Sequence, residues 1–88
     1  MNKYQIIFDE SVNKQLNKVD KSTKMKIFKK INKLEKEILS RHLKQGLPFF
    51  VEEVGQYRIC FEIDEKERTK KIFFIGNHKQ YEKWYSEK

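Results

Sequence analysis

The chain has 88 residues, of which 38% are hydrophobic and 38% charged, and its formal net charge is +7. This length predicts a single domain over residues 1–88, because it leaves little apolar surface for a second core. The apolar run near the N-terminus is too short for a signal sequence or a membrane span, so we expect no membrane association. A single cysteine, Cys60, excludes an internal disulfide bond and favours the reducing cytoplasm.

The positive charge is concentrated in the first half of the chain. Residues 1–45 contain 12 Lys or Arg and 5 Asp or Glu, whereas residues 46–88 contain 8 of each. A lysine-rich field of this kind attracts polyanions such as nucleic acids. A solvated lysine surface that serves only solubility explains the same composition, and charge alone does not separate the two interpretations.

The first half predicts a strand and two helices. Residues 4–8 alternate as a strand does, with one face formed by Tyr4, Ile6 and Phe8. Asp9 and Ser11 offer N-cap oxygens to a short helix. The apolar stripe of that helix consists of Val12, Leu16 and Val19.

A longer helix is predicted over residues 23–39, with Asp20 and Ser22 as candidate caps. Its predicted buried stripe consists of Ile27, Phe28, Ile31, Leu34 and Ile38. Its remaining surface carries Lys24, Lys26, Lys29, Lys30, Lys33 and Lys36. The two helices therefore predict a hairpin that is apolar inside and cationic outside.

After Gly46 the hydrophobic period changes to two. Strands are predicted over residues 47–54, 57–63 and 72–75, with a tight turn at 54–56, a polar loop at 64–69 and a helix at 79–86. In the middle strand one face consists of Tyr57, Ile59, Phe61 and Ile63, and the other of Arg58, Cys60 and Glu62. The order β-α-α-β-β-β-α predicts an α+β fold: a helical hairpin on one face of a small, mainly antiparallel, curved sheet whose other face is partly open.

The sequence does not indicate a metal or phosphate-loop site. One cysteine and two distant histidines, His42 and His78, lack the clustered spacing of a zinc site, and three isolated glycines do not form a phosphate-binding loop. We therefore expect neither a metal nor another cofactor.

Three polar side chains are candidates for chemistry. Arg58 can hold a phosphate in a bidentate manner, or its stem can cover apolar surface while its head is solvated. His78 can exchange a proton with a hydroxyl group, as histidines do in acid–base catalysis, or it can cap a helix. Tyr81 can stack on a base or pack in the core.

Residues 57–63 (Tyr-Arg-Ile-Cys-Phe-Glu-Ile) and 75–81 (Ile-Gly-Asn-His-Lys-Gln-Tyr), together with the element order, resemble the RelE/ParE toxin superfamily. The His-Lys-x-Tyr ending resembles the HigB branch in particular. The resemblance implies a RelE-like toxin of a type II toxin–antitoxin system that enters the ribosomal A site and cuts mRNA. Cleavage would use the 2′-hydroxyl as nucleophile without a metal, and a cognate antitoxin would neutralise the toxin.

The resemblance also implies roles for individual residues. Arg58 matches the phosphate-binding arginine of the family, His78 its basic or general acid/base residue, and Tyr81 its C-terminal aromatic residue. RelE carries lysines on the strand before the arginine, whereas this chain reads Phe-Phe-Val-Glu-Glu there. Glu52 or Glu53 is then a general base, a surface residue or an antitoxin contact. The cations expected to grip mRNA or the ribosome are Lys29, Lys33, Arg41, His42, Lys44 and Lys79.

Three functions are compatible with these residues. The first is a ribosome-dependent mRNA endonuclease. The second is a binding protein on the same fold, either a ParE-like inhibitor of DNA gyrase or a catalytically inert family member. The third is a general RNA-binding protein with a lysine-rich helix. His78 and Tyr81 favour the nuclease, because inhibition by binding needs no acid/base groups.

Overall fold

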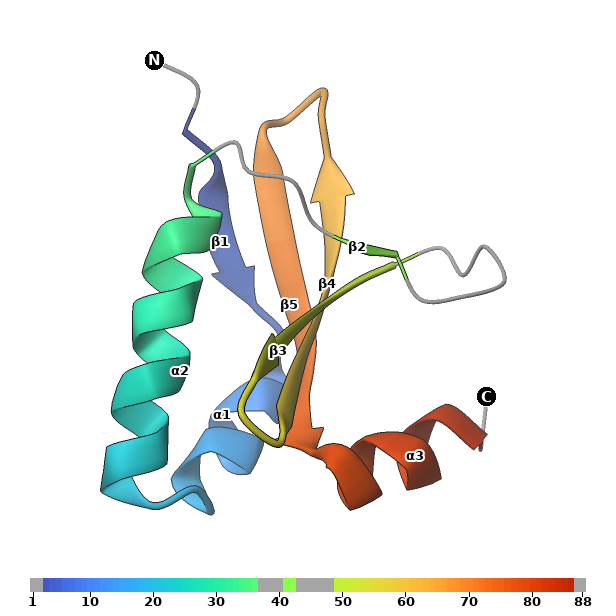
Figure 1. The fold of residues 1–88 in the computed structure, drawn as a ribbon. Coiled ribbons are helices and arrows are strands. Elements are labelled where there is room, and N and C mark those ends of the chain that lie inside the picture. The colour runs from blue at the N-terminus through green and yellow to red at the C-terminus, as the bar shows by residue number, and fades with distance from the viewer. Residues whose placement is uncertain (1–2, 37–40, 43–48, 87–88) are drawn as a thin grey trace.

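The computed structural model describes residues 3–36, 41–42 and 49–86, with only the backbone for 41–42 (Figure 1). The elements are β1 (Gln5–Phe8), α1 (Glu10–Asn17), α2 (Lys21–Leu34), β2 (Arg41–His42), β3 (Phe50–Val54), β4 (Tyr57–Asp64), β5 (Thr69–Asn77) and α3 (His78–Ser86). The predicted α+β class and element order are confirmed, with one addition. Residues 41–42 form a short strand where the sequence predicted none.

The described strands form one sheet in the order β1-β5-β4-β3-β2. β1 runs parallel to β5 and the other pairs are antiparallel, so the mainly antiparallel sheet is as predicted. β3 and β4 are joined by the predicted tight turn, where Gly55 has a φ of +59°, a conformation that glycine adopts without a steric cost. β2 pairs only with Val51 and Phe50, so the end of β3 nearest this turn has no strand on its outer side among the described residues.

The two helices of the hairpin begin at aspartates. Asp20 caps α2, because its carboxylate accepts a hydrogen bond from the Thr23 backbone N–H at 3.0 Å, and the hydrogen bonding to Thr23 lowers the pKa of this carboxyl. Asp9 occupies the N-cap of α1, but its carboxylate accepts from the Ser11 hydroxyl at 2.8 Å instead. Ser22 lies inside α2, which begins two residues earlier than predicted. Ile38, a predicted core residue, lies outside the described residues.

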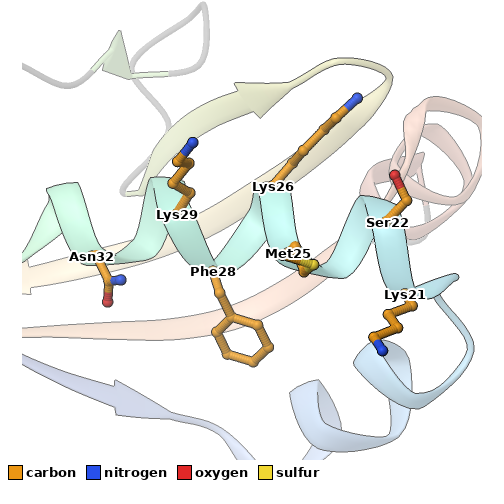
Figure 2. A pocket seen from close by; sticks show the side chains of 7 residues that line it. All are labelled: Lys21, Ser22, Met25, Lys26, Phe28, Lys29 and Asn32. Carbon is orange, nitrogen blue, oxygen red and sulfur yellow. The ribbon is translucent and has the colours of Figure 1, made fainter.

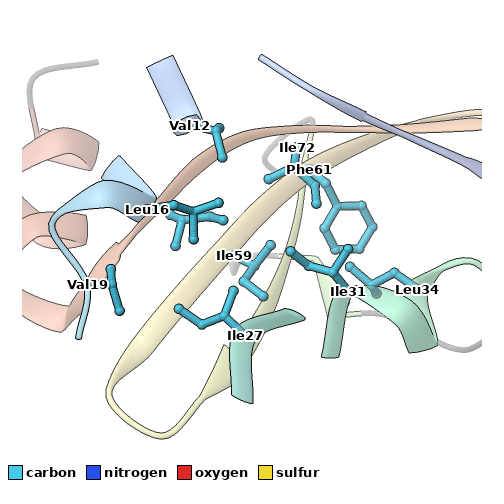
Figure 3. Close-up of a cluster of buried hydrophobic side chains, with 10 residues drawn as sticks. Val12, Leu16, Val19, Ile27, Ile31, Leu34, Ile59, Phe61 and Ile72 are labelled. Atoms are coloured by element: carbon cyan, nitrogen blue, oxygen red, sulfur yellow. The ribbon is translucent and has the colours of Figure 1, made fainter. Parts of the chain in front are cut away.

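α1 and α2 cover one face of the sheet and bury the main core there (Figures 1 and 3). This core consists of Val12, Leu16, Val19, Ile27, Ile31, Leu34, Ile59, Phe61, Ile72 and Ile75. The apolar stripes of both helices face the Ile59 side of β4, as the periodicities of the helices and the strand predicted.

The opposite face of the sheet is less open than the sequence suggested. α3 packs on it over a second cluster of Phe49, Val51, Cys60, Phe74 and Tyr81. Trp84 stacks on Phe74 with ring centroids 4.6 Å apart. A helix with three aromatic residues covers apolar strand residues that would otherwise face water, and this burial is the physical reason for the difference.

One predicted core residue is exposed. Phe28 is 41% exposed because it follows Ile27 by one position, about 100° around the helix, and so leaves the buried stripe. Phe8, for which no burial was predicted, is 37% exposed at the end of β1, which pairs only with β5 among the described strands. Conversely, Lys70 is only 1% exposed, and its ammonium lies 4.4 Å from the centroid of the Tyr4 ring, a favourable cation–π arrangement.

The contrast between Ile31 and Phe28 can be tested by unfolding in urea. Ile31 is 4% exposed, so Ile31→Ala should lower the free energy of unfolding by about 2–5 kcal/mol. Phe28→Ala removes a larger side chain from the same helix but should cost less than half as much, because water already reaches the ring. Equal losses would place Phe28 in the core.

Candidate functional site

Arg58 lies near the start of β4, where strand pairing fixes its neighbours. Its register partners are Glu53 on β3 and Gly76 on β5. Directly opposed residues of antiparallel strands project to the same face, and Arg58 Nε lies 3.7 Å from Glu53 Oε2. The Arg58 side chain is 17% exposed and that of Glu53 is 59% exposed. The guanidinium is therefore partly desolvated beside a carboxylate that a ligand can reach.

His78 reaches the same place because it is the first residue of α3, directly after β5. Its Nδ1 lies 3.3 Å from Arg58 Nη2, and its Nε2 lies 3.0 Å from Glu82 Oε2. Because a guanidinium only donates hydrogen bonds, Nδ1 must accept here, and a neutral ring then carries its proton on Nε2 and donates it to Glu82. The contacts of both ring nitrogens thus orient the imidazole.

The start of α3 is fixed by a reciprocal pair of hydrogen bonds. Asn77 N–H donates to Gln80 Oε1, and Gln80 N–H donates to Asn77 Oδ1, both at 2.8 Å. This capping box satisfies two backbone donors of the helix N-terminus. The preceding Gly76 allows close packing, because a Cβ there would lie 2.8 Å from the tip of the Phe74 ring. These local features determine where His78 stands relative to β4.

Arg58 and His78 line a surface pocket of about 430 Å³ together with Gly55, Gln56, Asn77 and Lys79. The cationic side chains on this lining are Arg58 and Lys79, and the imidazole of His78 lies 3.3 Å from the Arg58 guanidinium. A pocket of this volume is in the usual range for small-molecule sites. Its charge suits a phosphate group with an attached sugar.

Tyr81 points away from this pocket and into the second core cluster, where it is 8% exposed. Its ring stacks on Tyr85 at a centroid distance of 6.0 Å and also contacts Phe74 and Trp84. Burial, with smaller effects of Cys60 and Tyr85, raises the pKa of the Tyr81 phenol to about 12, against an opposing effect of Arg58. The phenol is therefore neutral at physiological pH and does not accept a proton there.

A larger hollow of about 830 Å³ lies along α2 and is lined by Lys21, Ser22, Met25, Lys26, Phe28, Lys29 and Asn32 (Figure 2). These lining residues come from one helix and surround Met25, which is 65% exposed, and Phe28. No candidate catalytic residue lies in this lining. The smaller pocket at Arg58 is therefore the candidate active site.

Comparison of the whole chain with solved structures identifies its fold. No protein-family model matches the sequence, and no curated protein matches it significantly. A chain of the RelBE2 toxin–antitoxin complex from Mycobacterium tuberculosis matches with a TM-score of 0.77 and 20% identity, over 88% of this chain and 93% of that one. The isolated Escherichia coli RelE toxin matches with a TM-score of 0.72 and 15% identity, over 96% and 97%.

An archaeal RelE–RelB complex from Pyrococcus horikoshii contains a further match, with a TM-score of 0.71 and 19% identity over 89% of this chain and 97% of that one. This chain has the RelE fold. The resemblance expected from residues 57–63 and 75–81 is thus confirmed at the level of three-dimensional structure.

The RelE fold of this chain separates the two adjacent glutamates. Glu52 pairs in register with Ile59 and faces α2, where its carboxylate lies 3.5 Å from Lys30 Nζ. Glu53 faces the opposite way and contacts Arg58. Of the two candidate general bases, Glu53 is the one that contacts Arg58, because side chains alternate across a strand.

The candidate RNA-binding cations of this RelE-like chain fall into separate places. Lys79 lines the Arg58 pocket, whereas Lys29 and Lys33 lie on α2 and line a smaller hollow at the β3 edge. Arg41 and His42 form β2, whose side chains are not described, and Lys44 lies outside the described residues.

The described residues of this RelE-like chain contain no group of three or more His, Cys, Asp or Glu side chains that would suit a metal ion. None of the helices in these same ranges has the length and apolar character needed to cross a membrane.

Sequence reasoning missed Glu82 and the capping box of α3. The signal for the box was present, since Asn77 followed three residues later by Gln80 is the expected spacing of such a motif. Glu82 stands four residues after His78, a spacing that brings two side chains together on a helix. The contact can be predicted only once a helix is known to begin at His78.

The raised pKa of Tyr81 predicts a defined dependence of stability on pH. A phenol whose pKa is about 12 in the folded protein and about 10 in the unfolded chain stabilises the fold below pH 10. That contribution should be lost as the pH rises from about 10 through about 12. The difference in unfolding free energy between the wild type and Tyr81→Phe should therefore shift against the wild type over this window. A pH-independent difference would show that the phenol is not buried.

Proposed function

We propose that this protein is the toxin of a type II toxin–antitoxin system and acts as a ribosome-dependent mRNA endonuclease. The observation that carries this proposal is the convergence of His78 and Glu53, from two other elements, on Arg58, which lines a basic surface pocket together with His78. The RelE fold supports it, because the matched structures include toxin–antitoxin complexes and an isolated RelE toxin. The reaction needs no metal or other cofactor.

The three side chains provide the groups that RNA cleavage through the 2′-hydroxyl requires. Glu53 accepts the 2′-hydroxyl proton, and the 2′-oxygen attacks the adjacent phosphorus. The bond from phosphorus to the 5′-oxygen breaks, and His78 in its protonated form gives that oxygen a proton. Arg58 binds the phosphate through parallel N–H donors and stabilises its developing charge. The products are a cyclic 2′,3′-phosphate and a free 5′-hydroxyl.

Substrate binding and the protonation of His78 are coupled through Arg58. In the free protein Arg58 occupies Nδ1 of His78 at 3.3 Å, so this nitrogen cannot carry a proton while the contact persists. A phosphate attracts the guanidinium more strongly than a neutral ring nitrogen does, because the hydrogen bond to an anion is charge-assisted. As Arg58 turns to the phosphate, Nδ1 becomes free to take a proton, and Glu82 at Nε2 stabilises the imidazolium.

The proposed partner that controls this activity is a cognate antitoxin protein. Three of the similar structures are complexes whose names pair RelE-type toxins with RelB antitoxins, from a bacterium and two archaea. Under this proposal the free toxin acts in the cytoplasm, where it meets the ribosome and mRNA, and antitoxin binding keeps it inactive.

Brief induction in growing cells, followed by primer extension on cellular mRNA, tests the proposed activity. The wild type should produce new breaks within translated codons, and Arg58→Ala should abolish them because the phosphate loses its ligand. Lys66→Ala removes a charge from the exposed turn between β4 and β5 and should leave the breaks unchanged.

Other results of this experiment would overturn the nuclease proposal. Growth arrest without mRNA breaks would indicate a toxin that acts by binding, such as an inhibitor of DNA gyrase. Equal cleavage by the wild type and Arg58→Ala would remove Arg58 from the site. Neither arrest nor breaks would indicate an inert member of the fold.

The adjacent glutamates offer a matched pair of variants for the general base. Glu53→Gln should reduce cleavage of mRNA on programmed ribosomes by about 10²–10⁴-fold, because the amide does not accept the 2′-hydroxyl proton. Glu52→Gln makes the same chemical change on the other face of β3 and should retain most of the activity. Similar rates for the two variants would exclude Glu53 as the base.

A further inference from the structure

A further basic hollow lies between α2 and the end of β3, and we call it the lysine groove. It has a volume of about 160 Å³ and is lined by Lys26, Lys29, Lys30, Lys33, Glu53 and Val54. It exists because β2 pairs only with Phe50 and Val51. The remaining edge of β3 is therefore flanked by the cationic side of α2.

The lysine groove and the Arg58 pocket lie on either side of the β3–β4 turn, which stands between α2 and α3 (Figure 1). Glu53 lies between the two hollows. The residue lines the groove, and its carboxylate lies 3.7 Å from Arg58 Nε. A ligand that occupies both hollows therefore passes Glu53, the residue proposed to take the proton in cleavage.

The charge in the groove is poorly compensated from within the protein. Lys30 pairs with Glu52 at 3.5 Å, whereas Lys26, Lys29 and Lys33 are exposed and form no ion pair with any of the described residues. Seven residues separate Lys26 from Lys33, a rise of about 10 Å along the helix. Cations spread over this distance on one side of a helix suit an extended anion with repeated charges better than a single small ion.

We propose that the lysine groove binds the phosphate backbone of single-stranded RNA next to the scissile phosphate. The strand then runs from the Arg58 pocket, around the β3–β4 turn, to α2. This inference rests on the proposed function, since it takes the strand in the Arg58 pocket to be RNA. A single strand fits this path because it bends freely around a hairpin end, whereas a stiff duplex resists bending over so short a distance.

The proposal is tested by binding an RNA that cannot be cut. The probe is a fluorescein-labelled 12-nucleotide single strand with 2′-O-methyl riboses, and the dissociation constant is measured by fluorescence anisotropy over a range of KCl concentrations. The test protein carries Lys26→Gln, Lys29→Gln and Lys33→Gln. The control carries Lys14→Gln, Lys18→Gln and Lys66→Gln, which remove the same charge from exposed positions elsewhere.

Each phosphate contact contributes about 0.7 to the slope of log affinity against log salt for a single strand. The slope measured for the groove variant, which lacks three lysines, should therefore be smaller in magnitude by about 2. This variant should also bind at least tenfold more weakly at low salt. The control should keep the wild-type slope. A four-nucleotide probe, too short to reach both hollows, should bind the wild type and the groove variant equally.

Two results would overturn the proposal: equal weakening in both triple variants, which indicates net charge alone, or a wild-type slope in the groove variant. The outcome is independent of the cleavage assay, because the probe is inert. If binding depends on the groove but cells show no mRNA breaks, the groove proposal stands and the nuclease proposal is wrong. If the wild type breaks mRNA but the groove variant binds RNA as the wild type does, the nuclease proposal stands and the groove proposal is wrong.

Discussion

The pairing of β4 with β5 in a single register is the constraint on which the rest of the molecule depends. Both strands are apolar on two faces, so Ile59 and Ile75 meet beneath the helical hairpin while Cys60 and Phe74 meet beneath α3. A slip of one residue in β4 would exchange its faces and turn the charged Arg58 and Glu62 toward the main core. The register is therefore fixed by burial on both sides rather than by any one contact.

The candidate site is a consequence of that register. Because Arg58 opposes Gly76, the chain that leaves β5 starts α3 directly beside the guanidinium, and His78 needs no long loop to reach it. The neighbouring pairing of β3 with β4 brings Glu53 from the other side. Strands thus hold two of the three polar groups, and a capped helix start holds the third, so their mutual geometry is supported by the packed core.

Much of this fold could be predicted from local patterns in the sequence. The alternation of residues 57–63 and the stripes of the two helices depend only on period, and both are found as predicted. Phe28 shows the limit of this reasoning, because an apolar residue at the margin of a stripe is either buried or exposed according to the angle at which its helix meets the sheet. The same applies to α3, whose packing on the second face depends on tertiary contacts.

The site could be predicted only in part, for a related reason. Arg58 and His78 were identified separately, but their contact depends on strand pairing across a separation of 20 residues. The choice between Glu52 and Glu53 depends on which face of β3 each occupies, and the sequence of two adjacent glutamates does not contain that information. Glu82 acquires a partner only once α3 is known to begin at His78.

The complete burial of Cys60 has a consequence for the motion of this molecule. Its thiol lies on β4 under Tyr81 and the other residues of the second cluster. A thiol-specific reagent reaches it only when α3 lifts from the sheet, so the rate of labelling in native conditions reports the free energy of that local opening. The same helix begins at His78, so the cysteine is a natural reporter of how firmly one wall of the Arg58 pocket is held in place.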